Sequence, residues 1–175
     1  MNAGLFVLRV VLGLLLVGHG SQKLFGRFGG HGLSGTGAFF QSVGFRPGRP
    51  MALIAGVTEV GGGLLLILGL LTPLAAASVI GTMVVAGSVH LRSGLWGQNG
   101  GYELALLYAI GGVALAFTGP GAWSLDHAVG QTALAGTGWA VAAVLVGGLS
   151  GLVLVIRARS ALGGEAASTS HGVSA

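Results

Sequence analysis

The segment MALIAGVTEVGGGLLLILGLL, residues 51–71, contains a single charged residue, Glu59. A helix that spans a membrane needs about 20 predominantly apolar residues, and this segment has that length and character. We therefore predict a transmembrane helix over residues 51–71. The turn that follows, Leu71-Thr72-Pro73, is very short. Pro73 suits the first turn of a second helix, because the amide hydrogen that it lacks would have no partner there.

Four more apolar stretches predict four more spanning helices, over residues 3–24, 73–91, 101–117 and 133–156. The composition agrees, with 53% hydrophobic and only 7% charged residues, whereas a soluble domain has about 25% charged residues. This composition excludes a soluble enzyme and a disordered chain. The predicted fold is all-α, a polytopic transmembrane helix bundle.

The chain has no cysteine, which excludes disulfides, iron–sulfur clusters and thiolate zinc sites within it. We therefore predict no metal site. The basic residues form no cluster with interleaved aromatic residues, so nucleic acid is not an expected partner.

The basic residues predict how the chain is oriented. If five helices span the membrane, all but one of the eight Lys and Arg residues share one side. Cytoplasmic loops carry an excess of these residues, so we expect the N-terminus outside and the C-terminus in the cytoplasm. The residues on the basic side are Lys23, Arg27, Arg46, Arg49, Arg92, Arg157 and Arg159. The first four of these are also candidate lipid-headgroup anchors.

The connecting segments complete the expected organisation. Residues 1–130 form a four-helix core, and the glycine-rich loop 27–50 contains a short interfacial or re-entrant helix near residues 36–43. Residues 131–157 supply a fifth transmembrane helix. Residues 158–175 are small and polar and are expected to form a disordered cytoplasmic tail.

Ionisable groups inside a spanning helix cost roughly 2.5–3.5 kcal/mol each and are candidate functional residues. The predicted ligand-binding cluster comprises Arg9, His19, Lys23, Glu59, His90 and Glu103. Residue spacing places Arg9 and Glu59 roughly 9 Å apart along the bundle axis, which predicts a direct or bridged contact. A buried ion pair that fixes helix register is the alternative. A haem held by His19 and His90 is a further alternative.

Small residues share a helix face with Glu59. Ala52, Gly56, Glu59 and Gly63 follow helical spacing, so they face the same way. We expect a neighbouring helix to approach this face closely and to hold the acid inside the bundle. Gly147 and Gly151 form a second small-residue packing motif, and Trp96, Tyr102 and Trp123 are expected at the membrane interfaces.

Several motifs together resemble the DoxX family of small bacterial membrane proteins. The resemblance covers about residues 4–127 and its core is a four-helix bundle, so the helix near residues 133–156 lies outside it. The family's charged signature residues map onto Arg9, His19, Lys23, Glu59 and Glu103. The motifs are LRVVLG (8–13), HGSQKLFG (19–26), GGHGL (29–33), AGVTEVGG (55–62), GLLTP (69–73), GGYE (100–103) and TGPGAWSLD (118–126).

The resemblance implies a multi-pass protein of the bacterial cytoplasmic membrane that is linked to oxidoreductase systems. Relatives include a subunit of a thiosulfate:quinone oxidoreductase and an actinobacterial protein associated with superoxide dismutase and a sulfurtransferase. The first functional hypothesis is therefore a quinone-binding membrane component, without catalytic activity of its own, that serves soluble redox proteins on the cytoplasmic side. Two alternatives stay open: a transporter or binding protein for lipids or small molecules, and a structural scaffold. Membrane lipids are expected partners, and the glycine-rich faces permit a homodimer.

Overall fold

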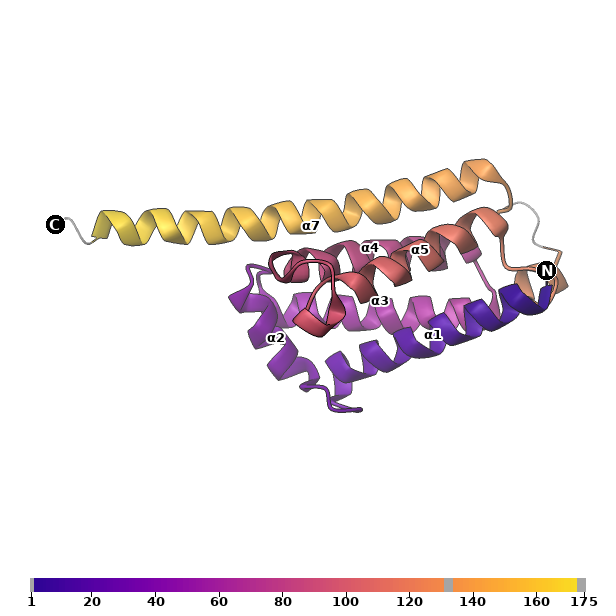
Figure 1. The fold of residues 1–175 in the computed structure, drawn as a ribbon, viewed down its shortest axis with the longest axis horizontal. Coiled ribbons are helices and arrows are strands. Elements are labelled where there is room, and N and C mark those ends of the chain that lie inside the picture. Colours follow the sequence, from indigo (N-terminus) through magenta and orange to yellow (C-terminus); the bar gives the residue numbers. More distant parts are fainter. Residues whose placement is uncertain (1, 131–133, 173–175) are drawn as a thin grey trace.

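The computed structural model describes residues 2–130 and 134–172, and the described residues are almost entirely helical, with no β-strand among them (Figure 1). The all-α prediction is confirmed. The elements, in chain order, are α1 (Asn2–Phe25), α2 (Gly32–Ser42), α3 (Gly48–Leu68), α4 (Thr72–His90), η1 (Leu91–Ser93), η2 (Gly97–Asn99), α5 (Glu103–Thr118), α6 (Leu125–Ala128) and α7 (Thr137–Gly172).

Four segments of the described chain are long and apolar enough to cross a membrane: Asn2–Phe25, Gly48–Leu68, Thr72–Ser93 and Thr137–Gly164. Helix α5 is apolar but has only 16 residues. At 1.5 Å per residue it is about 24 Å long, somewhat less than the roughly 30 Å hydrocarbon core. The helix predicted over residues 101–117 is therefore present, but it is the shortest of the five.

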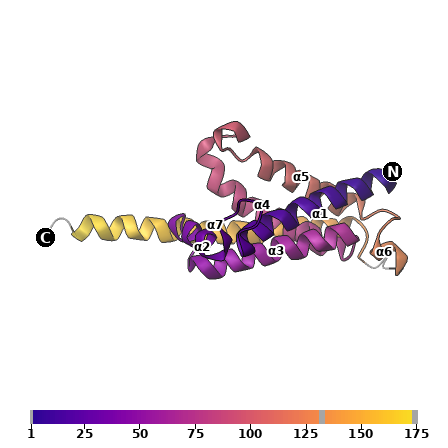
Figure 2. The same ribbon diagram turned by 90° about the horizontal axis from the view of Figure 1, so that it is seen from below.

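The helices form a bundle with two distinct ends (Figure 1). Helix α2, η1 and η2 lie at one end, which we call the α2 end. The N-terminus, the α3–α4 turn and α6 lie at the other, which we call the α6 end (Figures 1 and 2). The 11-residue α2 lies across the bundle end and packs against α3. Its Phe40 and the following Phe45 belong to one buried apolar cluster with Val155 and Ala158 of α7.

Glycines bring α1 and α3 into close contact, as the small-residue face around Glu59 predicts. A methyl group on Gly13 would lie 2.5 Å from the carbonyl oxygen of Gly63, and one on Gly20 would lie 2.7 Å from that of Gly56. No side chain fits at these distances, so the two backbones touch directly. Glu59 lies between Gly56 and Gly63 and is buried against α1.

Helix α7 packs chiefly on α4, and the two run in the same direction (Figure 1). The predicted packing motif makes this contact. A methyl group on Gly147 would lie 2.5 Å from the carbonyl oxygen of Ala77, and one on Gly151 would lie 2.7 Å from that of Gly81.

Helix α7 continues well past the expected end of the fifth span and protrudes beyond α2 (Figures 1 and 2). The expectation of a disordered tail over residues 158–175 therefore differs from the structure, in which residues 158–172 continue the helix. Residues 173–175 lie outside the described part. The segment contains Ala, Leu, Arg and Glu, which favour helix, and it follows an already formed helix, so no new nucleus is needed.

Candidate functional site

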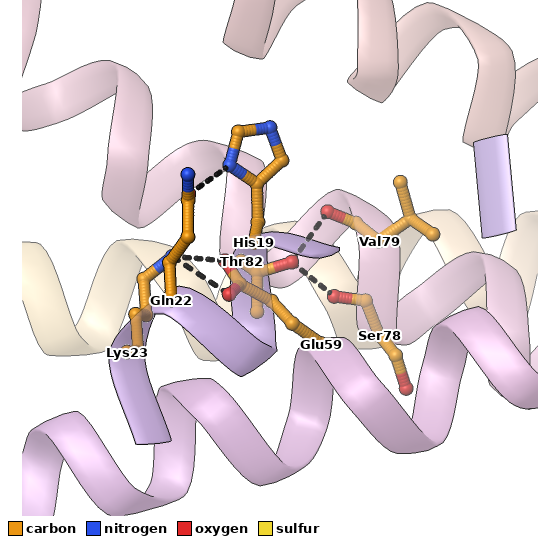
Figure 3. Close-up of polar contacts among 7 residues, drawn as sticks. All are labelled: His19, Gln22, Lys23, Glu59, Ser78, Val79 and Thr82. Carbon is orange, nitrogen blue, oxygen red and sulfur yellow. Dashed lines mark hydrogen bonds and ion pairs between the residues drawn. The ribbon is translucent and has the colours of Figure 1, made fainter. Parts of the chain in front are cut away.

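Lys23 of α1 and Glu59 of α3 form an ion pair inside the bundle (Figure 3). The Lys23 Nζ donates to both carboxylate oxygens, at 2.8 Å to Oε1 and 2.7 Å to Oε2. The Glu59 side chain is 3% exposed and that of Lys23 is 24% exposed. Lys23 therefore does not serve as the simple headgroup anchor that its place near the helix end predicts, because its ammonium points to the buried acid.

The packing of α1 on α3 explains this pairing. Gly20 lies against Gly56, so Lys23 lies three residues towards the α2 end and Glu59 three residues towards the α6 end. The two Cα atoms are therefore about 9 Å apart along the axis. Helical side chains lean towards the N-terminus of their own helix, and α1 and α3 are antiparallel. The two side chains thus lean towards each other and close the gap.

The expected contact between Arg9 and Glu59 is wrong. Arg9 is fully buried, and its guanidinium donates to the carbonyl oxygens of Leu66, at 3.0 Å, and Trp123. The Gly13–Gly63 contact puts Arg9 level with residue 67, about 12 Å from Glu59 along the axis. The side chains also lean in opposite directions, which separates them further.

Arg9 instead belongs to a buried polar cluster at the α6 end, which we call the α6-end clamp. It comprises Arg9, the carbonyls of residues 66, 67 and 123, Thr72 and Asp126. Asp126 Oδ1 accepts from the amide of Leu71 at 2.9 Å. Its Oδ2 accepts from the amide and the hydroxyl of Thr72, at 3.0 and 2.8 Å. Asp126 also interacts electrostatically with Arg9. The Arg9 cation therefore lies at the C-terminal end of α3, and the Asp126 carboxylate lies at the N-terminal end of α4. The helix dipoles favour both placements.

His19 connects the ion pair to α5. Its Nδ1 lies 3.1 Å from Oε1 of Gln22, and its ring meets that of Tyr108 edge to face at 5.9 Å. The Glu59 carboxylate interacts electrostatically with both His19 and Tyr108. Three of the predicted residues, His19, Lys23 and Glu59, are thus brought together.

Arg9 and Glu103 lie elsewhere, whereas His90 lines the same cavity as Lys23 and Glu59 without contacting them. His90 Nδ1 is 2.8 Å from the carbonyl oxygen of Gly100, and Glu103 Oε2 accepts from the amide of Gly97 at 2.8 Å. Both contacts hold the η1–η2 connection at the α2 end. The Nδ1 atoms of His19 and His90 contact different partners, Gln22 and Gly100. The described residues include no group of three or more His, Cys, Asp or Glu side chains that could hold a metal ion.

A cavity of about 450 Å³ adjoins the ion pair, and we call it the Glu59 groove. It lies between α3, α4 and α7, and Phe39, Phe40 and Phe45 line it from the α2 end. Most of its wall is apolar. Its polar side chains are Lys23, Thr58, Glu59, Ser78, Thr82, His90 and Ser150, and Figure 3 shows Ser78 and Thr82 of α4 beside Glu59.

The Glu59 groove opens sideways, towards the region that lipid would occupy. Ile54, Leu74 and Val146 line it and are 53%, 55% and 62% exposed. These apolar side chains would contact lipid tails in a membrane, so a lipophilic molecule could enter from the bilayer. We expected a ligand site among the first four spanning helices, but α7 also lines this groove.

The comparison with protein families decides what kind of protein this is. The family model named DoxX matches residues 4–91, which include α1 to α4. This chain belongs to the DoxX family. The DoxX protein described here has its ion pair, its α1–α3 glycines and Arg9 inside the matched region. Glu103, Asp126 and the α7 wall of the Glu59 groove lie outside it.

Three relatives of this DoxX protein are membrane or uncharacterized proteins. An uncharacterized protein of Haemophilus influenzae is 39% identical over 127 residues, which cover 69% of this chain and 86% of the relative. An uncharacterized membrane protein of Mycobacterium tuberculosis is 31% identical over 139 residues, covering 73% and 82%. The inner membrane protein YqjF of Escherichia coli is 29% identical over 127 residues, covering 72% and 92%. No solved structure gives a significant match.

Two residues of the site escaped the sequence analysis of this DoxX protein. From the sequence, Asp126 is an acidic residue in a loop. The available signal is Ser124 in Ser124-Leu125-Asp126-His127, because Ser commonly caps the start of a helix, which would include Asp126. The Ser124 hydroxyl does accept from the amide of His127. Tyr108 is 3% exposed in the middle of α5, and its place among apolar residues gave no signal of a polar neighbour.

Proposed function

We propose that this DoxX protein binds a quinone or a similar lipophilic molecule in the Glu59 groove and serves as the membrane component of an oxidoreductase system. The observation that carries the proposal is an ion pair on the wall of a mostly apolar groove that opens towards lipid. Ligand sites commonly combine apolar walls with a few polar groups that orient the ligand. The groove volume of about 450 Å³ is within the usual range for such sites, roughly 300–1,000 Å³.

The ion pair offers the groups that a quinone headgroup needs. The Lys23 ammonium has three N–H donors, and two are directed to Glu59. The third is available for a quinone carbonyl. Reduction of a quinone to a quinol consumes two electrons and two protons, and Glu59 and Lys23 are groups that exchange protons. The electrons would come from a soluble redox partner on the cytoplasmic side.

The proposed orientation places the N-terminus outside and the α2 end in the cytoplasm. The described basic residues other than Arg9 belong to elements near that end, and cytoplasmic segments are enriched in such residues. Because the chain lacks cysteine, single cysteines can report on sidedness without background. Ser93→Cys should react with an impermeant maleimide only after lysis, and Val129→Cys should react in intact cells or spheroplasts. The reverse labelling would overturn the orientation.

The binding proposal is tested with purified protein in detergent. Ubiquinone and menaquinone are titrated against the protein after lipid extraction of the native sample. Thr82→Trp fills the groove from α4 beside Glu59, and Leu107→Trp adds the same ring to the exposed side of α5 as a control. Thr82→Trp should abolish quinone binding while Leu107→Trp retains it.

Two results would contradict the proposal. One is a wild-type protein that neither contains nor binds either quinone. The other is equal binding by the wild-type protein and Thr82→Trp. Either result would leave the two alternatives, a transporter or binding protein for another molecule and a structural scaffold.

A further inference from the structure

A second groove, of about 370 Å³, lies between α4, α5 and α7. We call it the Arg159 groove. It uses a different face of α4 from the Glu59 groove: Gly87, Ser88 and Leu91 line it, whereas Val85, Val89 and His90 line the first. The close contact of α4 with α7 separates the two cavities. The Arg159 groove is therefore independent of the proposed quinone site.

The Arg159 groove occupies one leaflet only. Its residues on α4 and the start of η1 run from Met83 to Leu91, a length of about 12 Å. This is less than half of the roughly 30 Å hydrocarbon core. Its residues on α5 belong to the first two turns, and those on α7 begin at Leu152. All three helices thus contribute their halves nearest the α2 end.

The groove is mostly apolar along its length, with Ser88 on the α4 side, and has two further polar side chains at one end. Arg159 and Tyr102 are its polar side chains at the α2 end. Neither makes a hydrogen bond or an ion pair with any residue that the structure describes. Gly87 lines the groove on the α4 side, and a methyl group there would fit at ordinary contact distance, 3.7 Å from the Cβ of Ala105 and 3.9 Å from that of Tyr102.

We propose that the Arg159 groove binds an anionic phospholipid. One acyl chain lies along the apolar floor, and the lipid phosphate accepts hydrogen bonds from the Arg159 guanidinium and the Tyr102 hydroxyl. Arginine recognises phosphate through paired, charge-assisted hydrogen bonds, and basic pockets between transmembrane helices bind anionic headgroups. Nearby Arg92 adds positive charge to the same end of the bundle.

The bound lipid would join α7 to the rest of the bundle. Helices α5 and α7 contact each other much less than each contacts α4. A lipid with its phosphate between Tyr102, which immediately precedes α5, and Arg159 of α7 would bridge them. The DoxX family model matches only residues 4–91, so two of the three walls lie in the part of the chain that it does not match.

Native mass spectrometry of the full chain tests this proposal. The detergent-purified protein is delipidated and mixed with equal amounts of dioleoylphosphatidylglycerol and dioleoylphosphatidylcholine. The wild-type protein should retain the phosphatidylglycerol preferentially. Arg159→Gln should retain about fivefold less of it, the change expected for one basic side chain at a membrane surface. Arg157→Gln removes the same charge two residues away, outside the groove, and should retain it as the wild type does.

A second variant tests the acyl-chain part of the groove. Gly87→Leu fills the floor without changing any charge and should also lose phosphatidylglycerol. The proposal is overturned if the wild-type protein does not distinguish the two lipids, or if Arg159→Gln and Gly87→Leu both bind as the wild type does. Equal losses in Arg159→Gln and Arg157→Gln would also overturn it, because they would indicate a diffuse surface charge. Quinone binding by these variants should be unchanged, which separates this proposal from the previous one.

Discussion

Lys23 and Glu59 meet because they lie on antiparallel helices and each side chain leans towards the N-terminus of its own helix. The Lys23 side chain extends from near the α2 end towards the middle of the bundle, and the Glu59 side chain extends from the middle of α3 towards the α2 end. The Lys23 Nζ then contacts both carboxylate oxygens. The same rule turns Arg9 away from Glu59 and into the α6-end clamp. Helix direction, as much as depth, decides which intramembrane charges pair in this bundle.

Removing one member of the Lys23–Glu59 pair should destabilise the protein, and the two single variants should differ. Lys23→Met leaves a carboxylate that is 3% exposed without its cation, and we expect a loss of about 3–5 kcal/mol. Glu59→Gln should cost less, because Lys23 is 24% exposed and can turn towards water. Thermal unfolding in detergent measures both. The double variant should be more stable than the sum of the two losses predicts, by about 0.5–3 kcal/mol. Strict additivity would contradict the buried pair.

Asp126→Asn should weaken the start of α4. The carboxylate accepts three hydrogen bonds from residues 71 and 72, and an amide has only one oxygen to accept with. We expect a loss of about 1–3 kcal/mol and faster amide hydrogen exchange in the first turn of α4. The adjacent His127→Asn is the control, because His127 is exposed. Unchanged exchange at residues 71–75 in Asp126→Asn would refute this role.

Arg9→Lys should be destabilising although it keeps the charge. The Arg9 guanidinium donates to carbonyl oxygens of two separate segments: Leu66 and Ile67 in one, and Trp123 in the other. The ammonium of a lysine lacks this forked geometry. Losing one hydrogen bond to a charged donor costs about 1.5–3 kcal/mol. Arg27→Lys, at an exposed position, should be neutral. The two variants are compared by their midpoints of thermal unfolding, and equal midpoints would disprove the clamp.

Gly147→Ala should separate α7 from α4, whereas Gly148→Ala should not. The added methyl at Gly147 would lie 2.5 Å from the carbonyl oxygen of Ala77, and the one at Gly148 meets nothing within 4 Å. Gly148→Ala should instead stabilise α7 by about 0.5–1 kcal/mol, because Ala is the better helix former. Unfolding midpoints and limited proteolysis of the residue 119–136 connection report the difference. If both variants behave alike, the close packing of α7 on α4 is incorrect.

The sequence predicts much of this fold because apolar length and small-residue spacing are local signals. Residues 51–71 predict α3 within a few residues of its bounds, Gly48–Leu68. The face that Glu59 shares with Gly56 and Gly63 packs against α1 as predicted. Membership of the DoxX family is confirmed as well.

Pairings between distant residues were harder to predict. The axial distance between Arg9 and Glu59 was estimated from the predicted helix ends and came out too short. The true register of α1 on α3 is set by the Gly13–Gly63 and Gly20–Gly56 contacts, and the positions of the helix ends do not determine it. Asp126 was missed because two of its three hydrogen-bond donors are backbone amides of a segment 54–55 residues away, and backbone groups carry no sequence signal.

The α6-end clamp also bears on how the chain enters the membrane. Its members leave the ribosome far apart: Arg9 and Trp123 are separated by 114 residues. When the α3–α4 hairpin is inserted, Arg9 is already present to bind the last carbonyls of α3, but Asp126 has not yet been made. The first amides of α4 must then bind water or headgroups until the segment around residue 126 is made and replaces them. The α6-end clamp is therefore completed late in synthesis. In a stalled chain shorter than 126 residues, Arg9 would bind the end of α3, but the start of α4 would lack its carboxylate partner.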